Sequence, residues 1–255
     1  MASDDVKISV ESASCAYGDD YLKWKTWGDS EFGNLSKNET VYFDSEIRRT
    51  RSAFPSGAKV LEIGFGNGNF LAFGREKGWD ISGTEVNEAL VRVAQDRGFS
   101  ATHAGDLSSF PDDAYDLIVA FDVLEHIPQD ELPDMILEIK RVLKKDGFFI
   151  ARFPNGDSPF GLMNQNGDVT HITAIGSGKV HYFAAKTDMA VIFVGGEAEP
   201  LFGLGLVQFI HGIFALPIRR LMNLFVRLVF FPRSSVPFFS SNMVLVYQAA
   251  NKNRQ

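Results

Sequence analysis

The feature that most constrains the fold is a glycine-rich segment at residues 60–70, which reads VLEIGFGNGNF. Apolar residues at Val60, Leu61 and Ile63 predict a buried strand, and this strand runs directly into glycines at alternate positions. Glycine permits a positive φ and lets a ligand lie against the main chain where a Cβ would intrude. The segment therefore predicts a strand, a tight loop and a helix, with a ligand site beyond the carboxyl end of the strand.

The spacing of the glycines separates two ligand classes. A dinucleotide fingerprint, G-x-G-x-x-G, would place its third glycine at position 69, where this chain has Asn69. The chain instead has Gly64, Gly66 and Gly68, preceded by Glu62 inside the predicted strand. A nicotinamide oxidoreductase is therefore disfavoured.

Acidic residues follow three later strands of the predicted sheet. Glu85 ends the second strand, 21 residues beyond Gly64, where a carboxylate can accept hydrogen bonds from two ribose hydroxyls. Asp106 follows a short third strand, and Asp122 follows the fourth. Because the carboxyl ends of parallel strands share one edge of a sheet, we expect these acids to line the same crevice.

In this order and spacing, the four segments resemble those of class I methyltransferases, which bind S-adenosylmethionine. The resemblance implies an α/β fold with a Rossmann-like, doubly wound, seven-stranded and mostly parallel sheet. It also implies an antiparallel last strand, which in this chain would follow a helical insertion. The predicted cofactor-binding residues are Glu62, Gly64, Gly66, Gly68, Glu85, Asp106 and Asp122.

The resemblance assigns separate parts of the cofactor to these acids. Glu85 would bind the ribose, and Asp106 the adenine amino group. Asp122 would face the methionine part. Glu62 would either bind the amino end through water or accept hydrogen bonds from local amides.

The alternation of apolar patterns along the chain predicts a parallel sheet with helices on both faces. Strands are expected near residues 58–63, 80–84, 99–103, 115–121, 147–153, 190–197 and 243–247. Helices are expected near residues 39–54, 69–77, 87–97, 130–144 and 180–189, and a loop over 154–178. We divide the chain into an N-terminal lid or cap (1–57), a methyltransferase core (58–200), a hydrophobic basic insertion (201–241) and a final strand with a tail (242–255). Trp24 and Trp27 belong either to the lid or to the packing of the sheet edge.

A narrower resemblance covers residues 154–171. These begin with Pro154 and Asn155, continue with SPFG at 158–161 and end with GDVTH at 167–171. This succession resembles bacterial methyltransferases of polysaccharide and O-antigen gene clusters. It implies O-methylation of a sugar in a cell-surface polysaccharide or its precursor. The alternatives are another small acceptor, such as a quinone or a natural product, and a non-catalytic scaffold at the membrane.

A sugar hydroxyl is a poor nucleophile, so a general base is expected. His126 follows Glu125 just beyond the fourth strand. His171 lies three residues after Asp168, whose carboxylate could orient the imidazole and raise its basicity. We predict His126, His171 and Asp168 as catalytic residues. Alternatively, the first histidine belongs to a helix start and the other two residues fix a loop.

Several of these side chains also carry donor atoms suited to Mg²⁺. They are Asp122, Glu125, His126, Asp168 and His171. Their spacing matches no compact metal motif, so no metal ligand is predicted.

Residues 201–240 differ in composition from the rest of the chain. They contain no Asp or Glu, four arginines and eight of the 23 phenylalanines. We expect Pro217 to break this segment into two parts, neither of which could span a bilayer. A basic amphipathic helix would suit an anionic membrane surface, whereas a homodimer contact or a cap over the core would satisfy the same apolar residues.

The overall charge and the cysteine content limit the partners and the compartment. The net charge of −7 argues against a nucleic-acid partner. Cys15 is the only cysteine, and the first residues lack the apolar core of a secretory signal. We therefore expect a cytoplasmic enzyme with a small-molecule or glycan acceptor, associated with the inner face of the membrane if residues 201–240 contact lipid.

Overall fold

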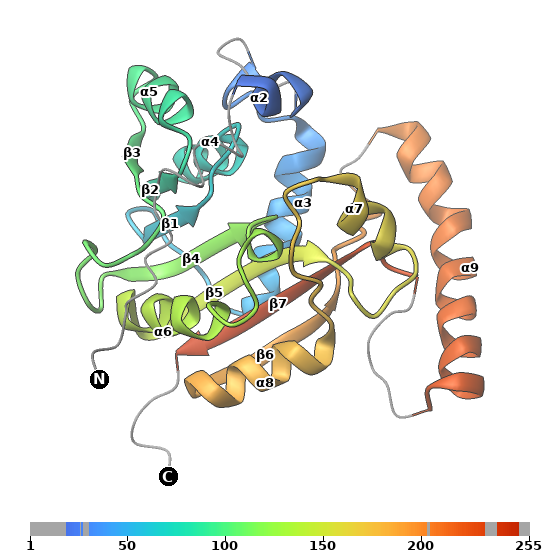
Figure 1. The fold of residues 1–255 in the computed structure, drawn as a ribbon. Helices are drawn as coiled ribbons and strands as arrows, with labels where there is room; N and C mark the ends of the chain where they lie inside the picture. The colour runs from blue at the N-terminus through green and yellow to red at the C-terminus, as the bar shows by residue number, and fades with distance from the viewer. Residues whose placement is uncertain (1–18, 26, 28–30, 203–204, 233–238, 250–255) are drawn as a thin grey trace.

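The computed structural model describes residues 19–25, 27, 31–202, 205–232 and 239–249 (Figure 1). These residues form a seven-stranded sheet of order β3-β2-β1-β4-β5-β7-β6. The strands are β1 (Lys59–Ile63), β2 (Asp80–Glu85), β3 (Ser100–His103), β4 (Tyr115–Phe121), β5 (Leu143–Pro154), β6 (Met189–Gly196) and β7 (Asn242–Ala249). Strands β1 to β5 pair in parallel, and β7 lies antiparallel between β5 and β6. The predicted fold, including its antiparallel last strand, is confirmed.

Helices cover both faces of the sheet, because the central strands are apolar on both sides. One core lies between the sheet and α3 (Lys37–Ile47), α4 (Asn69–Glu76) and α5 (Glu88–Asp96). The other lies between the sheet and α6 (Leu132–Val142) and α8 (Ser177–Thr187). Neighbours in one strand alternate between the cores, as Val60 and Leu61 do. The carboxyl ends of β1, β2 and β4, where predicted site residues lie, are therefore held by strands packed on both faces.

The helix before β1 is shorter than predicted. It begins at a capping box in which Ser36 and Glu39 exchange hydrogen bonds between side chain and backbone. It continues only into the short 3-10 helix η2 (Arg48–Thr50), because Arg51 takes a left-handed conformation with a φ of 58°. That conformation ends the helix ahead of Pro55.

Three local predictions were incomplete or misplaced. Helix α6 ends at Val142 and β5 begins at Leu143, whereas the sequence predicted a helix to about residue 144 and a strand only from about residue 147. Asp146 instead has a φ of 63° within the irregular start of β5. The expected loop after β5 contains α7 (Gly161–Gly167), and the N-terminal segment contains α2 (Asp19–Lys25). Both short helices are polar enough to lack a clear apolar period.

The predicted break at Pro217 was wrong, since α9 (Leu206–Phe230) is one helix of 25 residues with Pro217 inside it. Proline removes a single i to i−4 hydrogen bond, and the bonds of the other turns can persist around it. Figure 1 shows α9 standing beside the body of the molecule. Among the described helices, none combines the length and apolarity needed to cross a lipid bilayer.

Candidate functional site

The loop between β1 and α4 adopts the conformation that its glycines permit. Gly64, Gly66 and Gly68 have φ values of 67°, 49° and 71°. The amides of Gly64 and Phe65 donate to the carbonyl of Thr84 at the end of β2, at 2.8 and 3.2 Å. A residue with a Cβ would be strained at each of the three glycine positions, so the loop requires this sequence.

Two aromatic side chains of the N-terminal segment lie against this loop. A Cβ built on Gly66 would come within 2.8 Å of the Trp27 ring, and one on Gly68 would collide with the Phe32 ring. Trp27 therefore packs on the glycine loop, whereas Trp24 is 54% exposed. Gly66 and Gly68 are therefore needed for a second reason, because a Cβ at either position would collide with a ring of the N-terminal segment.

Glu85 lies at the end of β2, directly beside the loop. One of its carboxylate oxygens accepts the amide of Gly66 at 3.0 Å, and the other accepts those of Val86 and Asn87 at 2.8 and 3.0 Å. Burial raises the pKa of Glu85, and these hydrogen bonds oppose that change. A carboxylate has about four acceptor positions. Binding both ribose hydroxyls, as predicted, would therefore require release of one amide.

Glu62 lies within β1 and is only 4% exposed. Burial raises the pKa of Glu62 well above its usual value, and the neighbouring Glu85 raises it further. One of its oxygens, Oε2, has no hydrogen-bond partner among the described residues. A buried acceptor of this kind beside the glycine loop fits a cationic or hydrogen-bond-donating ligand group, such as the amino end of S-adenosylmethionine.

The other two predicted cofactor acids already have partners within the protein. Asp106 is exposed after β3, where its Oδ1 accepts the backbone amide and hydroxyl of Ser108 at 2.9 and 2.6 Å. Asp122 follows β4 with a φ of 58° and receives two hydrogen bonds from the guanidinium of Arg152, one of them at 2.9 Å. Their predicted contacts with adenine and methionine remain predictions.

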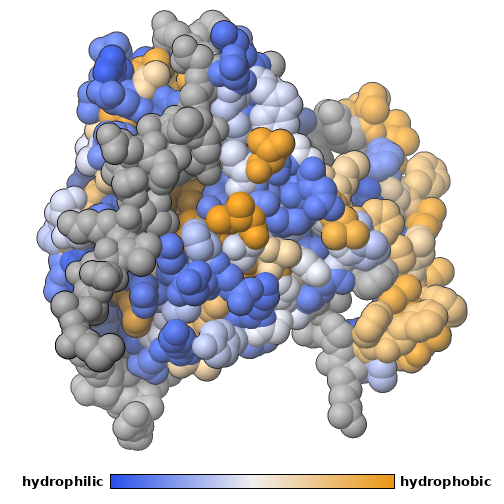
Figure 2. All heavy atoms as spheres, in the orientation of Figure 1, coloured by the Kyte–Doolittle hydropathy of each residue, from blue (hydrophilic) through white to orange (hydrophobic). Residues whose placement is uncertain are grey.

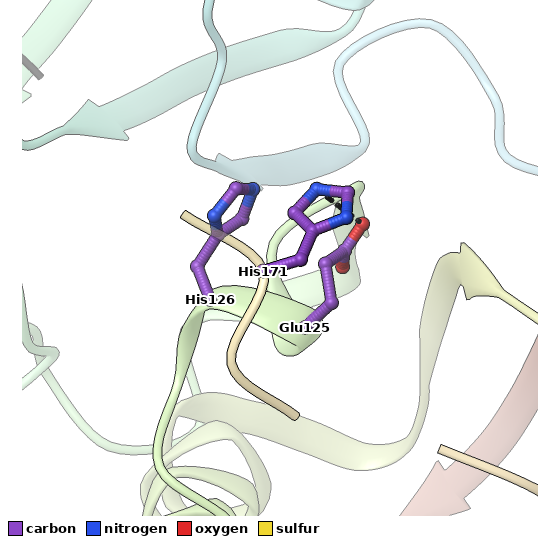
Figure 3. A group of neighbouring side chains, drawn as sticks. All are labelled: Glu125, His126 and His171. Atoms are coloured by element: carbon purple, nitrogen blue, oxygen red, sulfur yellow. Dashed lines mark ion pairs between the residues drawn. The ribbon is translucent and has the colours of Figure 1, made fainter. Parts of the chain in front are cut away.

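The two predicted histidines lie together. His126 ends the short 3-10 helix η3 (Leu124–His126), and His171 belongs to the segment after α7. Their ring centroids are 4.6 Å apart (Figure 3). Burial, followed by the neighbouring His171, lowers the pKa of His126 to about 4. His126 is therefore neutral at pH 7 and able to accept a proton, although it is a weak base.

Asp168 joins the N-terminal segment to this cluster instead of orienting His171. Its Oδ2 lies 3.8 Å from Nε2 of His171, too far for a hydrogen bond. The same oxygen lies 2.7 Å from Nζ of Lys25 and accepts the Tyr21 hydroxyl at 3.1 Å, both from α2. Although burial opposes the change, hydrogen bonds from Lys25 and Thr170 lower the pKa of Asp168. Nδ1 of His171 instead lies 3.0 Å from the carbonyl of Asn164.

Sequence reasoning gave Glu125 no catalytic or cofactor role. Its side chain is 1% exposed, and its carboxylate lies beside the imidazole of His171. Its position before His126 was visible in the sequence, but its burial was not, because a charged residue after a strand is usually solvated. Lys25 and Asn164 were missed for a related reason, since their partners are set by tertiary contacts.

The sheet order, the antiparallel β7 and the glycine loop flanked by buried acids define the Rossmann-like fold of the methyltransferase class. Within this class, the sequence profile of the Methyltransferase domain family matches residues 37–190. The chain therefore belongs to that family. The matched region runs from α3 to the start of β6 and includes both the glycine loop and the histidine cluster.

Similar proteins agree with this assignment. An uncharacterized methyltransferase of Bacillus pumilus is 28% identical over 130 residues, which cover 48% of this chain and 60% of that protein. A crystal structure of an S-adenosylmethionine-dependent methyltransferase from Archaeoglobus fulgidus superposes with a TM-score of 0.62 at 18% identity, covering 91% of this chain and all of the other. A putative sarcosine dimethylglycine methyltransferase from Galdieria sulphuraria gives a TM-score of 0.56 at 15% identity, covering 84% and 86%. Both of these solved structures share the fold of this chain.

Proposed function

We propose that this chain is an S-adenosylmethionine-dependent methyltransferase that binds its cofactor across the loop between β1 and α4. The observation that carries the proposal is the loop itself, with its three glycines at positive φ between the buried carboxylates of Glu62 and Glu85. S-adenosylmethionine carries an amino group and ribose hydroxyls, and the two buried acids offer hydrogen-bond acceptors for them. Trp27 and Phe32 would line the cofactor site from the N-terminal side.

The cofactor supplies an activated methyl group, and the residues of this chain position the acceptor and remove its proton. His126 is neutral near pH 7 and lies at the carboxyl end of β4, so it is our candidate for the base. His171 lies beside it and would orient the acceptor. Holding the reacting groups in place can lower the barrier by about 7–11 kcal/mol, and a base adds about 10² to 10⁴ in rate.

The cofactor part is tested by titration calorimetry with S-adenosylhomocysteine. We expect the wild type to bind with micromolar affinity and not to bind NAD. Glu85→Ala should weaken binding at least about tenfold, because Glu85 would accept hydrogen bonds from the ligand and also orders the loop. Glu88→Ala, an exposed glutamate at the start of α5, is the matched control and should bind as the wild type does. No binding by the wild type would refute the proposal.

For the acceptor, we propose a hydroxyl of a sugar in a cell-surface polysaccharide or its precursor. The support is the resemblance of residues 154–171, which supply α7 and His171 beside the predicted base. Transfer of labelled methyl groups to nucleotide sugars and glycan fragments, compared with quinones and phenolic natural products, tests this choice. Methylation of a quinone alone would assign the enzyme to the other acceptor class.

We also propose that α9 lies on an anionic membrane surface. Most of its apolar side chains are exposed, including Phe214 at 68%, Leu221 at 68% and Phe225 at 61%. Figure 2 shows this apolar surface gathered over α9. The helix contains three arginines and no acidic residue, a charge pattern that suits anionic lipid, whereas packing of α9 against α9 of a second copy would bring like charges together. Such a location would bring the site to lipid-linked glycan precursors.

A further inference from the structure

The cluster of Glu125, His126 and His171 has the donor atoms of a metal site. Glu125 and His126 come from η3, and His171 comes from the segment after α7 (Figure 3). One ligand atom from each residue can be chosen so that all three lie within 4.8 Å of one another. Around a tetrahedral ion with bonds of about 2.1 Å, ligand atoms lie about 3.4 Å apart. A modest contraction of the side chains would therefore bring them into a first coordination sphere.

Glu125 gives independent evidence that a cation belongs in this cluster. Its side chain is 1% exposed, and neither carboxylate oxygen has a hydrogen-bond partner among the described residues. A buried carboxylate without a partner costs several kcal/mol unless it is neutralised or binds a cation. The nearest imidazole, His171, approaches Oε1 only to 3.8 Å, which leaves both oxygens available.

The backbone contacts of the histidines point the same way. Nδ1 of His171 lies 3.0 Å from the Asn164 carbonyl, and Nδ1 of His126 lies 3.3 Å from the Thr170 carbonyl. Because a carbonyl only accepts, each Nδ1 carries a hydrogen, and Nε2 is the ring nitrogen left to bind a metal ion. Nε2 of His171 lies 3.8 Å from Oε1 of Glu125. A cation between these two atoms would bind both.

The two parts of the cluster are held together before any ion binds. The carbonyl of Glu125 accepts the amides of Ile172 and Thr173, at 2.9 and 3.0 Å. The hydroxyl of Thr173 also donates to the carbonyl of Ile127, at 2.6 Å. These bonds fix the segment that carries His171 onto η3, so little chain entropy remains to be lost when a ligand joins them.

We propose that Glu125, His126 and His171 bind one divalent transition-metal ion. Two imidazoles and one carboxylate are a donor set typical of Zn²⁺, Co²⁺, Mn²⁺ and Fe²⁺, whereas Mg²⁺ prefers oxygen ligands. Asp168 is not among the ligands, because its Oδ2 is held by Lys25 at 2.7 Å. Three protein ligands leave open coordination positions, which distinguishes this site from a closed structural one.

The open positions suggest a use that rests on the proposed function. An acceptor hydroxyl bound to the ion would lose its proton to water more readily, because a metal ion lowers the pKa of a bound oxygen. Methyl transfer to that oxygen would then not need His126 as the base, because His126 would be bound to the ion. The ion would thus select acceptors with a hydroxyl that can reach the cluster.

The test begins with the full chain, from which metal ions are first removed with a chelator. The protein is titrated with Co²⁺, whose binding is measured by visible absorption. Zn²⁺ is then added to displace the Co²⁺. We expect one Co²⁺ per chain with a tetrahedral or five-coordinate spectrum, and an affinity at least about tenfold lower for Glu125→Gln and for His171→Gln. His181→Gln, an exposed histidine on α8, is the matched control and should leave the spectrum unchanged. Thermal unfolding shows whether the two variants are folded. Zn²⁺ should raise the unfolding temperature of the wild type and leave that of the folded variants unchanged.

Binding of Co²⁺ at less than one equivalent, or equal binding by wild type and both variants, would overturn the proposal. Binding of Mg²⁺ with no response to Co²⁺ or Zn²⁺ would also overturn it. Titration with S-adenosylhomocysteine keeps this result separate from the proposed function. The Glu85→Ala variant should lose the cofactor product and keep the metal ion, whereas His171→Gln should show the reverse.

Discussion

At the scale of single residues, the site is unusual for its buried carboxylates. Glu62 is 4% exposed and Glu125 is 1% exposed, and both have an oxygen without a hydrogen-bond partner among the described residues. Carboxylates in this state destabilise the free protein when they ionise, so a ligand that binds to them also stabilises the fold. The stability of the free protein should therefore respond to changes at these positions.

Glu62→Gln should stabilise the free protein increasingly as the pH rises. Burial holds the pKa of Glu62 well above its ordinary value of 4.5. The native state therefore keeps a proton that the unfolded chain has lost, and wild-type stability falls as the pH rises from about 4.5 towards the raised pKa. The variant lacks this loss, so its advantage should be nearly absent below pH 4.5 and then grow by up to about 1.4 kcal/mol per pH unit.

Urea denaturation at several pH values between about 4 and 9 measures this difference. Glu76→Gln, on the exposed end of α4, is the control and should follow the wild-type curve. A pH-independent difference between Glu62→Gln and wild type would show that Glu62 titrates alike in the folded and unfolded chain.

Some residues of the site could be predicted from the sequence, and others could not. The glycines and Glu85 were found because the distance in sequence between the glycine loop and the acid matches that of class I methyltransferases. The pairing of Asp122 with Arg152, and of Asp168 with Lys25, could not be found in this way. These pairs join residues 30 and 143 positions apart, and only the folded sheet brings them together.

At the scale of elements, α9 is the part of the molecule that packs least against the rest. Its inward side is limited to a few residues, among them Leu216, which is 7% exposed, and Asn223, which accepts the amide of Phe239 at 3.0 Å. Arg219 pairs with Glu199 at the adjoining segment. The helix is therefore held in place by few contacts, and most of its apolar side chains stay exposed.

Replacing both Leu221 and Phe225 by Asp should abolish binding to anionic vesicles. Full burial of one such side chain contributes about 1.5–3 kcal/mol, so two replacements should weaken binding at least about a hundredfold. Arg220→Gln should weaken it only about fivefold and reduce its dependence on salt, since one basic residue near an anionic surface contributes about 1 kcal/mol.

Co-sedimentation with phosphatidylglycerol-containing vesicles measures this, and neutral vesicles provide the comparison. Leu137→Asp, a 42% exposed leucine on α6, is the matched control and should bind as the wild type does. Failure of the wild type to bind, together with a dimer in analytical ultracentrifugation, would assign α9 to a homodimer contact instead.

Most strands and helices were predictable because the doubly wound fold repeats one pattern of strand, turn and helix. The elements that were missed or misjudged are short or unusual. Helix α7 has the sequence GLMNQNG, which lacks an apolar period, and its place is set by contacts with β5. Helix α9 continues through Pro217, because a missing hydrogen bond costs a long helix less than two new ends would.

At the scale of the whole molecule, the N-terminal segment and the segment after α7 meet over the site. Lys25 and Tyr21 of α2 bind Asp168, while Trp27 and Phe32 lie on the glycine loop. The same N-terminal segment thus contacts both the predicted cofactor side and the predicted acceptor side of the crevice. Its closure should couple the two halves of the site.

Lys25→Met should loosen this closure without unfolding the core. Hydrogen bonds to charged groups contribute about 1.5–3 kcal/mol, so hydrogen exchange in residues 19–25 should quicken at least about tenfold. Binding of S-adenosylhomocysteine should weaken as well, because Trp27 would no longer be held over Gly66. The thermal unfolding midpoint should change little, since the lysine lies outside both cores.

Lys23→Met is the matched control for this change. Lys23 is on the same helix but pairs with Asp20 at 3.8 Å on a solvated surface, where an ion pair contributes little. Equal exchange in Lys25→Met, Lys23→Met and wild type would show that α2 is held by other contacts.

The position of β7 has a consequence for biosynthesis. This strand lies between β5 and β6, and among the described residues β6 pairs with β7 alone. During translation, β6 and α9 both leave the ribosome before residues 242–249 do. The facing edges of β5 and β6 are therefore still unpaired when the apolar helix α9 is already exposed. The sheet therefore stays open beside β5 until residues 242–249 have been made, and only then does the last strand complete the domain.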